Sequence, residues 1–194
     1  VSYNPDGLLA TVGEDKVVRV WDAAGRELLG LRGHTGTCGG VAFSPDGLRL
    51  ASAGSDGTVP IWDATPLRGG ERQEAASFEE HGDEVWTVAV NPVGPGIVSA
   101  GWYMPAALVW DAETLRGRAR FNGHGVVTFC VAWHPKGRRV ASAGSADGQF
   151  TVQVWDPTTG AEVFTLPAPG RPEFFAVAFS PPDGRYLVTG KGNN

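Results

Sequence analysis

The stretch HTGTCGGVAFSPDGLRLASAGSDGTVPIWD, residues 34–63, contains the pattern that decides the fold. Its apolar runs are short, and two of them lead into turn sequences, Pro-Asp-Gly at 45–47 and Ser-Asp-Gly at 55–57. Proline presets φ for such turns, and glycine accepts a positive φ. No run carries an apolar residue about every 3.6 residues, so the stretch predicts short β-strands and almost no helix.

The same phrases recur along the whole chain. The phrase VAFSPDG has five copies or near copies, and the steps between their first valines are 40, 47, 43 and 46 residues. Trp-Asp ends an apolar run four times, and a histidine stands seven residues before three of the repeated valines. Self-similarity with a period of this length is typical of stacked supersecondary units, here with four strands in each.

With Gly-His, Pro-Asp-Gly and Trp-Asp in a constant order, the chain resembles the WD-repeat β-propeller family over essentially its whole length. The resemblance implies an all-β fold of four-stranded antiparallel blades around a central channel. The repeats predict blades at about residues 1–33, 34–80, 81–123 and 124–169, followed by a half blade at 170–194. We therefore expect a partial propeller that forms an open arc rather than a closed ring, as a fragment of a longer protein.

The resemblance also implies a hydrogen-bonded tetrad in each blade. Its members are the histidine of Gly-His, a serine or threonine of the second strand, a turn aspartate and the tryptophan of Trp-Asp. The candidates are Thr11, Asp15 and Trp21; His34, Ser52, Asp56 and Trp62; His81, Ser99 and Trp110; and His124, Ser142, Asp147 and Trp155. Met104 occupies the aspartate position of the third blade, so that tetrad is incomplete and a distorted turn is predicted at 101–107.

Serine, histidine and aspartate also form hydrolase triads, but this combination recurs at equivalent positions in at least two blades. A catalytic site is one asymmetric constellation, so we interpret the tetrads as structural. The chain has no Cys-x-x-Cys, no His-x-x-x-His, no acidic calcium loop and no glycine-rich phosphate loop. We accordingly predict no catalytic residue, no metal and no cofactor.

Four residues carry local expectations. Pro60, inside a predicted third strand, removes a ladder donor and predicts a bulge. His134 replaces the serine or asparagine that precedes proline in other copies, and we expect it to be an exposed turn residue. Cys38 and Cys130 are expected to be buried reduced thiols, and a disulfide between them is the alternative.

Composition restricts the function further. The net charge of −5 argues against a nucleic-acid partner. No apolar run reaches the roughly 18 residues that a membrane span needs, so no membrane partner is expected. The sequence identifies no compartment, and the cytoplasm is the one we expect. The high glycine and proline content, 28 and 14 residues, reflects turn chemistry repeated in every period rather than disorder.

We expect a non-catalytic protein–protein interaction scaffold with a protein or peptide partner. In the family that the chain resembles, the contact surface commonly lies where the first strands begin. By repeat position, the candidate partner surface comprises Glu14, Thr37, Ser55, Glu84, Trp102, Tyr103, Val127 and Glu173. The alternative is a regulatory propeller segment of a larger bacterial enzyme, such as a kinase or a protease. It rests on a composition bias in which arginine outnumbers lysine 13 to 3.

Overall fold

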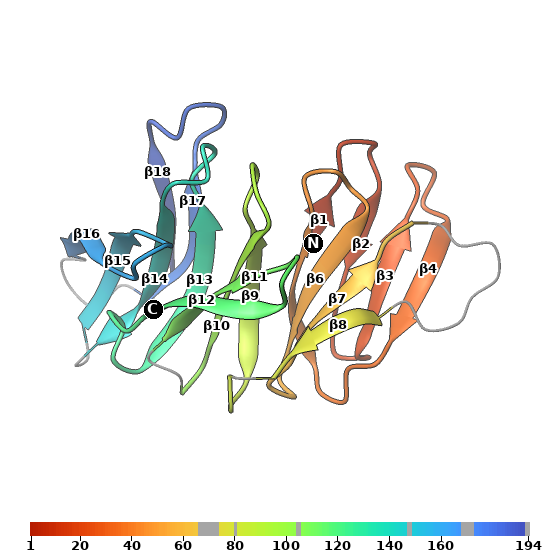
Figure 1. Cartoon of the computed structure of the whole chain (residues 1–194), viewed down its shortest axis with the longest axis horizontal. Helices are drawn as coiled ribbons and strands as arrows, with labels where there is room; N and C mark the ends of the chain where they lie inside the picture. The colour runs from red at the N-terminus through yellow and green to blue at the C-terminus, as the bar shows by residue number, and fades with distance from the viewer. Residues whose placement is uncertain (66–73, 80, 104–105, 147–148, 168–172, 193–194) are drawn as a thin grey trace.

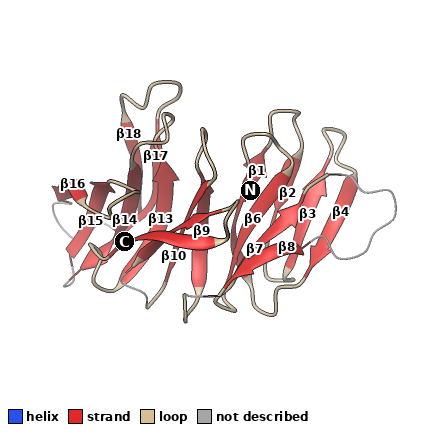
Figure 2. Cartoon of the chain, in the orientation of Figure 1, coloured by secondary structure: helices blue, strands red, loops and turns tan. Residues whose placement is uncertain are grey.

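The computed structural model describes residues 1–65, 74–79, 81–103, 106–146, 149–167 and 173–192. In these residues it has β-strands and turns and no helix (Figure 2). The strands are β1 (Ser2–Tyr3), β2 (Leu9–Thr11), β3 (Val17–Trp21), β4 (Glu27–Arg32), β5 (Cys38–Phe43), β6 (Arg49–Gly54), β7 (Val59–Asp63), β8 (Glu74–Phe78), β9 (Val85–Val90), β10 (Gly96–Gly101), β11 (Ala107–Asp111), β12 (Arg116–Phe121), β13 (Val127–Trp133), β14 (Val140–Ala146), β15 (Gln149–Trp155), β16 (Glu162–Pro167), β17 (Glu173–Phe179) and β18 (Leu187–Gly192).

The strands form five antiparallel sheets in chain order. Four sheets contain four strands each, and the last contains only β17 and β18. The first strands β1, β5, β9, β13 and β17 contact one another in succession, so they line the inner side of the assembly. The sheets lie side by side in an open arc, which confirms the fold predicted from the repeats (Figure 1).

The repeated Pro-Asp-Gly phrase makes the turn between the first and second strands of a sheet. In the second sheet, the Gly47 amide donates to the Ser44 carbonyl at 2.9 Å, and Gly47 has a φ of +71°. A Cβ at this position would lie 2.9 Å from Asn4 Nδ2 of the preceding sheet, so glycine also permits close approach between sheets.

The core lies between neighbouring sheets. Trp62, Trp110 and Trp155 are buried, and each is covered by the sheet before it. Phe78 stacks on Trp110 with ring centroids 4.6 Å apart, and Phe121 stacks on Trp155 at 4.8 Å. The outer strands of the first three blades thus each supply an apolar side chain to the tryptophan of the next blade.

The exposure of one outer-strand position, compared across the four complete blades, shows that the next blade buries it. Leu31, Phe78, Phe121 and Leu166 each pair with the residue three positions before their own blade's tryptophan. The first three are at most 4% exposed, whereas Leu166 is 44% exposed. The difference arises because the β17–β18 sheet has no third strand, and so no tryptophan, to lie against Leu166.

The bulge predicted at Pro60 does not lie there. The register of β7 against β8 shifts between Ile61 and Trp62, and the corresponding shift precedes the tryptophan in the other three blades. The irregularity therefore belongs to the repeat. The pairing of β6 with β7 stops at Ala51 and Ile61, so Pro60 lies just outside this ladder. This position suits proline, because proline has no amide proton to donate to a neighbouring strand.

The prediction of an exposed turn residue at His134 is also wrong. The ring is half-buried and meets Phe179 of the last sheet with centroids 5.0 Å apart and planes at 67°. Its Nδ1 accepts the Lys136 amide at 3.1 Å. His134 therefore closes its own turn and packs between two sheets.

The two cysteines are free thiols, so the alternative of a disulfide is excluded. Cys38 is buried, and burial raises the pKa of its thiol to about 12. Cys130 is half-buried rather than buried, and burial raises its pKa as well. Both thiols are therefore protonated and unreactive at neutral pH.

The contrast between Phe121 and Leu166 predicts different costs for the same truncation. Phe121→Ala removes a stacked ring and leaves a cavity over Trp155, so we expect the free energy of unfolding to fall by about 3 kcal/mol or more. Leu166→Ala should cost less than about 1 kcal/mol, because Leu166 is 44% exposed and lies against no tryptophan of a following sheet. Urea unfolding followed by tryptophan fluorescence measures both, and equal losses would contradict packing between blades as the source of the core.

Candidate functional site

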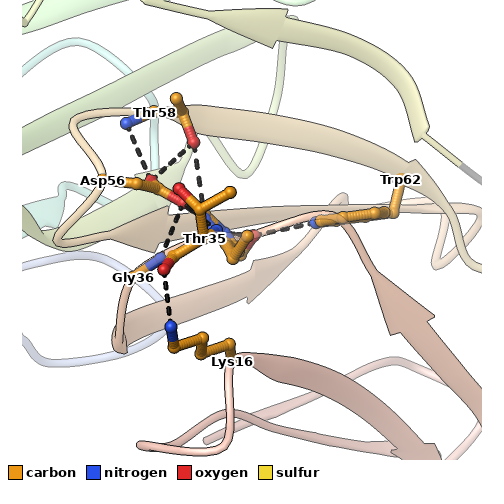
Figure 3. Close-up of polar contacts among 8 residues, drawn as sticks. Lys16, Thr35, Gly36, Asp56, Thr58 and Trp62 are labelled. Carbon is orange, nitrogen blue, oxygen red and sulfur yellow. Dashed lines mark hydrogen bonds and ion pairs between the residues drawn. The ribbon is translucent and has the colours of Figure 1, made fainter.

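The second blade brings all four of its predicted tetrad residues into one chain of hydrogen bonds (Figure 3). Trp62 Nε1 donates to Ser52 Oγ at 2.8 Å, and Ser52 Oγ lies 2.7 Å from His34 Nε2. His34 Nδ1 lies 2.9 Å from Asp56 Oδ2. The pattern is satisfied when Ser52 donates to Nε2 and Nδ1–H donates to the carboxylate.

Asp56 ties the tetrad to the backbone around it. Its carboxylate accepts the Thr35 amide at 2.7 Å, the Thr58 hydroxyl at 2.7 Å and the Thr58 amide at 3.1 Å. Burial opposes ionisation of Asp56, but the hydrogen bonds from Thr58, His34 and Thr35 together hold its pKa well below the usual range. Lys16 Nζ of the first blade donates to the Thr35 carbonyl of the second blade at 2.7 Å, and this hydrogen bond joins the two blades beside the tetrad (Figure 3).

The first blade has the shorter version of this network. Trp21 Nε1 donates to Thr11 Oγ1 at 2.7 Å. Asp15 forms an ion pair with Arg19 and accepts the Val17 amide at 3.3 Å. The hydrogen bond from Arg19 is the main cause of the lowered pKa of Asp15.

The fourth blade repeats the buried part of the network. His124 Nε2 lies 2.8 Å from Ser142 Oγ, to which Trp155 Nε1 donates at 3.2 Å. Thr151 Oγ1 lies 3.4 Å from His124 Nδ1. Asp147, the predicted fourth member, lies outside the described residues. Burial lowers the pKa of His124 to about 4.

The third blade keeps the histidine, the serine and the tryptophan of the tetrad. His81 Nε2 lies 2.5 Å from Ser99 Oγ, which accepts Trp110 Nε1 at 2.7 Å. Among the described residues, the buried Nδ1 of His81 has no hydrogen-bond partner. Burial, together with the charge of Arg120, lowers the pKa of His81 to about 4. Met104, at the aspartate position, lies outside the described residues.

The candidate partner surface lies along one edge of the arc. Its members either begin the first strands or stand in the turns between second and third strands, and antiparallel order brings these two sets to the same edge. The Ser55 amide donates to the Thr37 carbonyl at 2.8 Å, which joins one member of each set. Val127 pairs with Ser145, and Glu14 is exposed. Glu173 begins β17, but its side chain lies outside the described part of the chain.

Five aromatic rings form a continuous aromatic cluster on this edge. The rings are Trp86, Trp102, Tyr103, Phe129 and Phe150. Trp102 lies 6.2 Å from Trp86 and 6.3 Å from both Tyr103 and Phe129, between ring centroids. Trp102 is 43% exposed and Tyr103 is 71% exposed. Only Trp102 and Tyr103 of this cluster were selected from the sequence. The sequence spacing of the aromatic residues does not show that rings from three different strands and a turn come together.

A carboxylate-lined hollow adjoins the cluster between the second and third blades. The acidic hollow has a volume of about 400 Å³ and is lined by Asp56, Glu79, Asp83 and Glu84, with no lysine or arginine among its described lining residues. Glu84 connects it to the aromatic cluster, because Glu84 Oε2 accepts Trp86 Nε1 at 3.0 Å.

Two further classes of site receive no support from the described residues. Nowhere in them do three His, Cys, Asp or Glu side chains gather as metal ligands. Likewise, the described part of the chain contains no helix that is long and apolar enough to cross a membrane.

The burial of Asp56 predicts a larger role than that of its counterpart in the first blade. Asp56→Asn removes a carboxylate that accepts several hydrogen bonds, so we expect the free energy of unfolding to fall by about 2–3 kcal/mol. Asp15→Asn is the matched control, because the Asp15 side chain is 51% exposed against 8% for Asp56. Urea midpoints should drop for the first variant and stay near wild type for the second. The reverse order would contradict the tetrad as a framework element.

The two buried histidines predict a pH dependence of stability. Their pKa values of about 4 in the folded chain compare with an ordinary value of 6.5. Between about pH 6.5 and pH 4 the unfolded chain binds more protons, so the free energy of unfolding falls as the pH falls through this window. Each histidine accounts for about 3 kcal/mol by pH 4. Urea unfolding at several pH values measures this slope, which should be shallower in His124→Gln; a flat profile would contradict neutral buried imidazoles.

Comparison with known proteins identifies the repeat. The chain matches the family model described as "WD domain, G-beta repeat" over residues 1–22, 25–63, 72–103 and 117–156. It is 28% identical over 141 residues to protein transport protein SEC31 of Chaetomium globosum, an alignment that covers 72% of this chain and 11% of that protein. It is 30% identical over 163 residues to a guanine nucleotide-binding protein subunit beta-like protein of Encephalitozoon cuniculi, covering 78% and 46%.

A solved structure shares the fold. A chain in the crystal structure of the mitotic checkpoint complex superposes with a TM-score of 0.81 and 23% sequence identity, over 97% of this chain and 57% of that one. The chain spans less than half the length of each of the two curated relatives named above. Because the family model matches more than half of the chain, and the sheets have the strand order that its repeats require, the chain belongs to the WD40 repeat family.

Proposed function

We propose that this chain is a non-catalytic scaffold that holds a protein or peptide partner at its candidate partner surface. WD40 proteins typically act by binding other proteins, and the names of the two relatives describe a transport protein and a subunit-like protein. The alternative, a regulatory segment of a larger bacterial enzyme, concerns sequence that flanks this chain and stays a prediction.

The geometry of the tetrad supports a structural rather than a catalytic role for its serine. Ser52 is fully buried, and its Oγ already accepts the Trp62 indole proton while it bonds His34. A nucleophilic serine needs an accessible oxygen beside a site that a substrate can enter. The same closed arrangement occurs at Ser99 and Ser142, so it belongs to the repeat.

The observation that carries the proposal is the exposure of Trp102 and Tyr103. Large aromatic side chains at the centre of an exposed patch are frequent anchors of protein interfaces. Three tryptophans of this chain are fully buried in the framework, whereas Trp102 stands in a turn and is 43% exposed. The turn is one residue longer than that of the second blade: 11 positions separate Ser99 from Trp110, against 10 between Ser52 and Trp62.

The backbone holds this pair in place. Tyr103 has a φ of +57°, which is uncommon for a bulky residue and indicates a turn fixed by its surroundings. Gly101 lies directly against the Glu84 carbonyl, where any Cβ would collide with that oxygen. The turn is therefore pinned to the start of β9, and a partner that binds there does not have to order a loose loop.

The test is a selection of random peptides displayed on phage against the folded chain. We expect the enriched peptides to bind at least about 10-fold more weakly to Trp102→Ala and to Tyr103→Ala, because each substitution removes an anchor. Tyr186→Ala is the matched control, since Tyr186 is 62% exposed and stands outside the candidate partner surface. Fluorescence anisotropy of labelled peptides measures the affinities. The absence of enrichment, or binding that ignores both anchors, would overturn the proposal.

A further inference from the structure

The aromatic cluster has a charge environment that selects one class of partner. We propose that the edge formed by the aromatic cluster and the acidic hollow binds an arginine side chain of a basic peptide segment. The inference rests on the proposed function and names the chemistry of the partner at the same surface.

The aromatic cluster supplies faces on which a planar cation can stack. The Trp102 ring stands at 80° to Tyr103 and at 88° to Phe129, so these rings form walls of different orientation rather than a flat stack. Trp86 adds a third neighbour of Trp102, tilted at 45°. A guanidinium group stacks on such a face, and tryptophan gives the strongest attraction to a cation.

Close approach between inner strands fixes the base of the aromatic cluster. Trp86 of β9 lies over Gly39 of β5, where a Cβ would be 2.6 Å from Trp86 Cε3. Trp86 is also held by its hydrogen bond to Glu84 at 3.0 Å. The ring is thus fixed on one side by backbone and at its nitrogen by a carboxylate.

The carboxylates of the acidic hollow favour a positively charged partner. Glu84 joins the aromatic cluster through Trp86, and Glu79 and Asp83 line the same hollow. Asp56 stays ionised, because its hydrogen bonds hold its pKa well below the usual range. Among the described residues near this edge, Lys16 and Arg120 donate to neutral oxygens, the Thr35 carbonyl and Asn122 Oδ1, and neither forms an ion pair with a carboxylate of the acidic hollow. A cationic side chain therefore meets four carboxylates beside exposed rings, and these two cations offset that charge only in part.

Arginine fits this combination better than lysine does. Its guanidinium can stack flat on an indole and still donate in its own plane to a carboxylate, whereas an ammonium acts as a hydrated point charge. An acidic peptide would be repelled by the carboxylates of the hollow, and a neutral peptide would place no opposite charge against them. The peptide is accordingly expected to carry arginine beside residues that contact the remaining rings.

The experiment extends the phage selection to matched peptides. Each enriched peptide is resynthesised with arginine replaced by citrulline, which keeps the shape and removes the charge, or by lysine. We expect the citrulline peptides to bind at least about 10-fold more weakly, and the lysine peptides to fall between. Binding of the arginine peptides should weaken as salt rises.

Substitutions in the protein test which carboxylates attract the arginine. Glu84→Gln can still accept the Trp86 proton, and Asp83→Asn can still accept the Glu84 amide, so each removes charge and keeps the hydrogen bond. We expect several-fold weaker binding to each, and no change in Glu113→Gln, which lies in the turn after β11 at the opposite edge.

The outcomes separate the two proposals. Enriched peptides that require Trp102 but lack arginine, or that tolerate citrulline, would overturn the arginine inference and leave the interaction surface standing. Peptides that bind without Trp102 and Tyr103 would overturn both. Arginine peptides that lose affinity with citrulline and with Glu84→Gln would support both.

Discussion

The structure depends on one interaction, the donation of a tryptophan indole proton to a hydroxyl of the second strand, which is buried in the second, third and fourth blades and partly buried in the first. It occurs in all four complete sheets, from Trp21 to Thr11 and at each later Trp-Asp. The bond satisfies the polar end of a large apolar ring, so the ring can be buried between blades. Where a histidine follows, the same hydroxyl also bonds the imidazole and links the inner turn to the third strand.

The second and third blades differ at the aspartate position of the tetrad, and this difference lies beside the candidate partner surface. The second blade closes its turn around Asp56, which bonds His34 and the backbone on both sides. The third blade has methionine at that position, leaves His81 Nδ1 without a partner among the described residues, and presents Trp102 and Tyr103 in a longer turn. The exposed rings of the candidate partner surface therefore stand next to the one tetrad whose aspartate position holds methionine.

Sequence reasoning predicted the repeats well because each marker has a local physical role. Trp-Asp, Gly-His and Pro-Asp-Gly report on strand ends and turns within one blade, and these are set by neighbouring residues. Contacts between blades were not predictable in this way. The ring contact of Trp102 with Phe129 and the packing of His134 on Phe179 depend on how sheets lie against one another. The prediction of a bulge at Pro60 failed for a different reason. The repeat itself contains a register shift, which in the second blade lies between Ile61 and Trp62, and the local effect of a proline gives no information about it.

The central claim is that the tryptophans divide into a closed framework and an open binding edge. Fluorine NMR of the chain labelled with 5-fluorotryptophan tests it most directly, because each of the seven tryptophans gives one signal, assigned by substitution with phenylalanine. Addition of a selected peptide should shift the signals of Trp102 and Trp86 and leave those of Trp62, Trp110 and Trp155 unchanged. Shifts at the framework tryptophans with none at Trp102 would contradict the account.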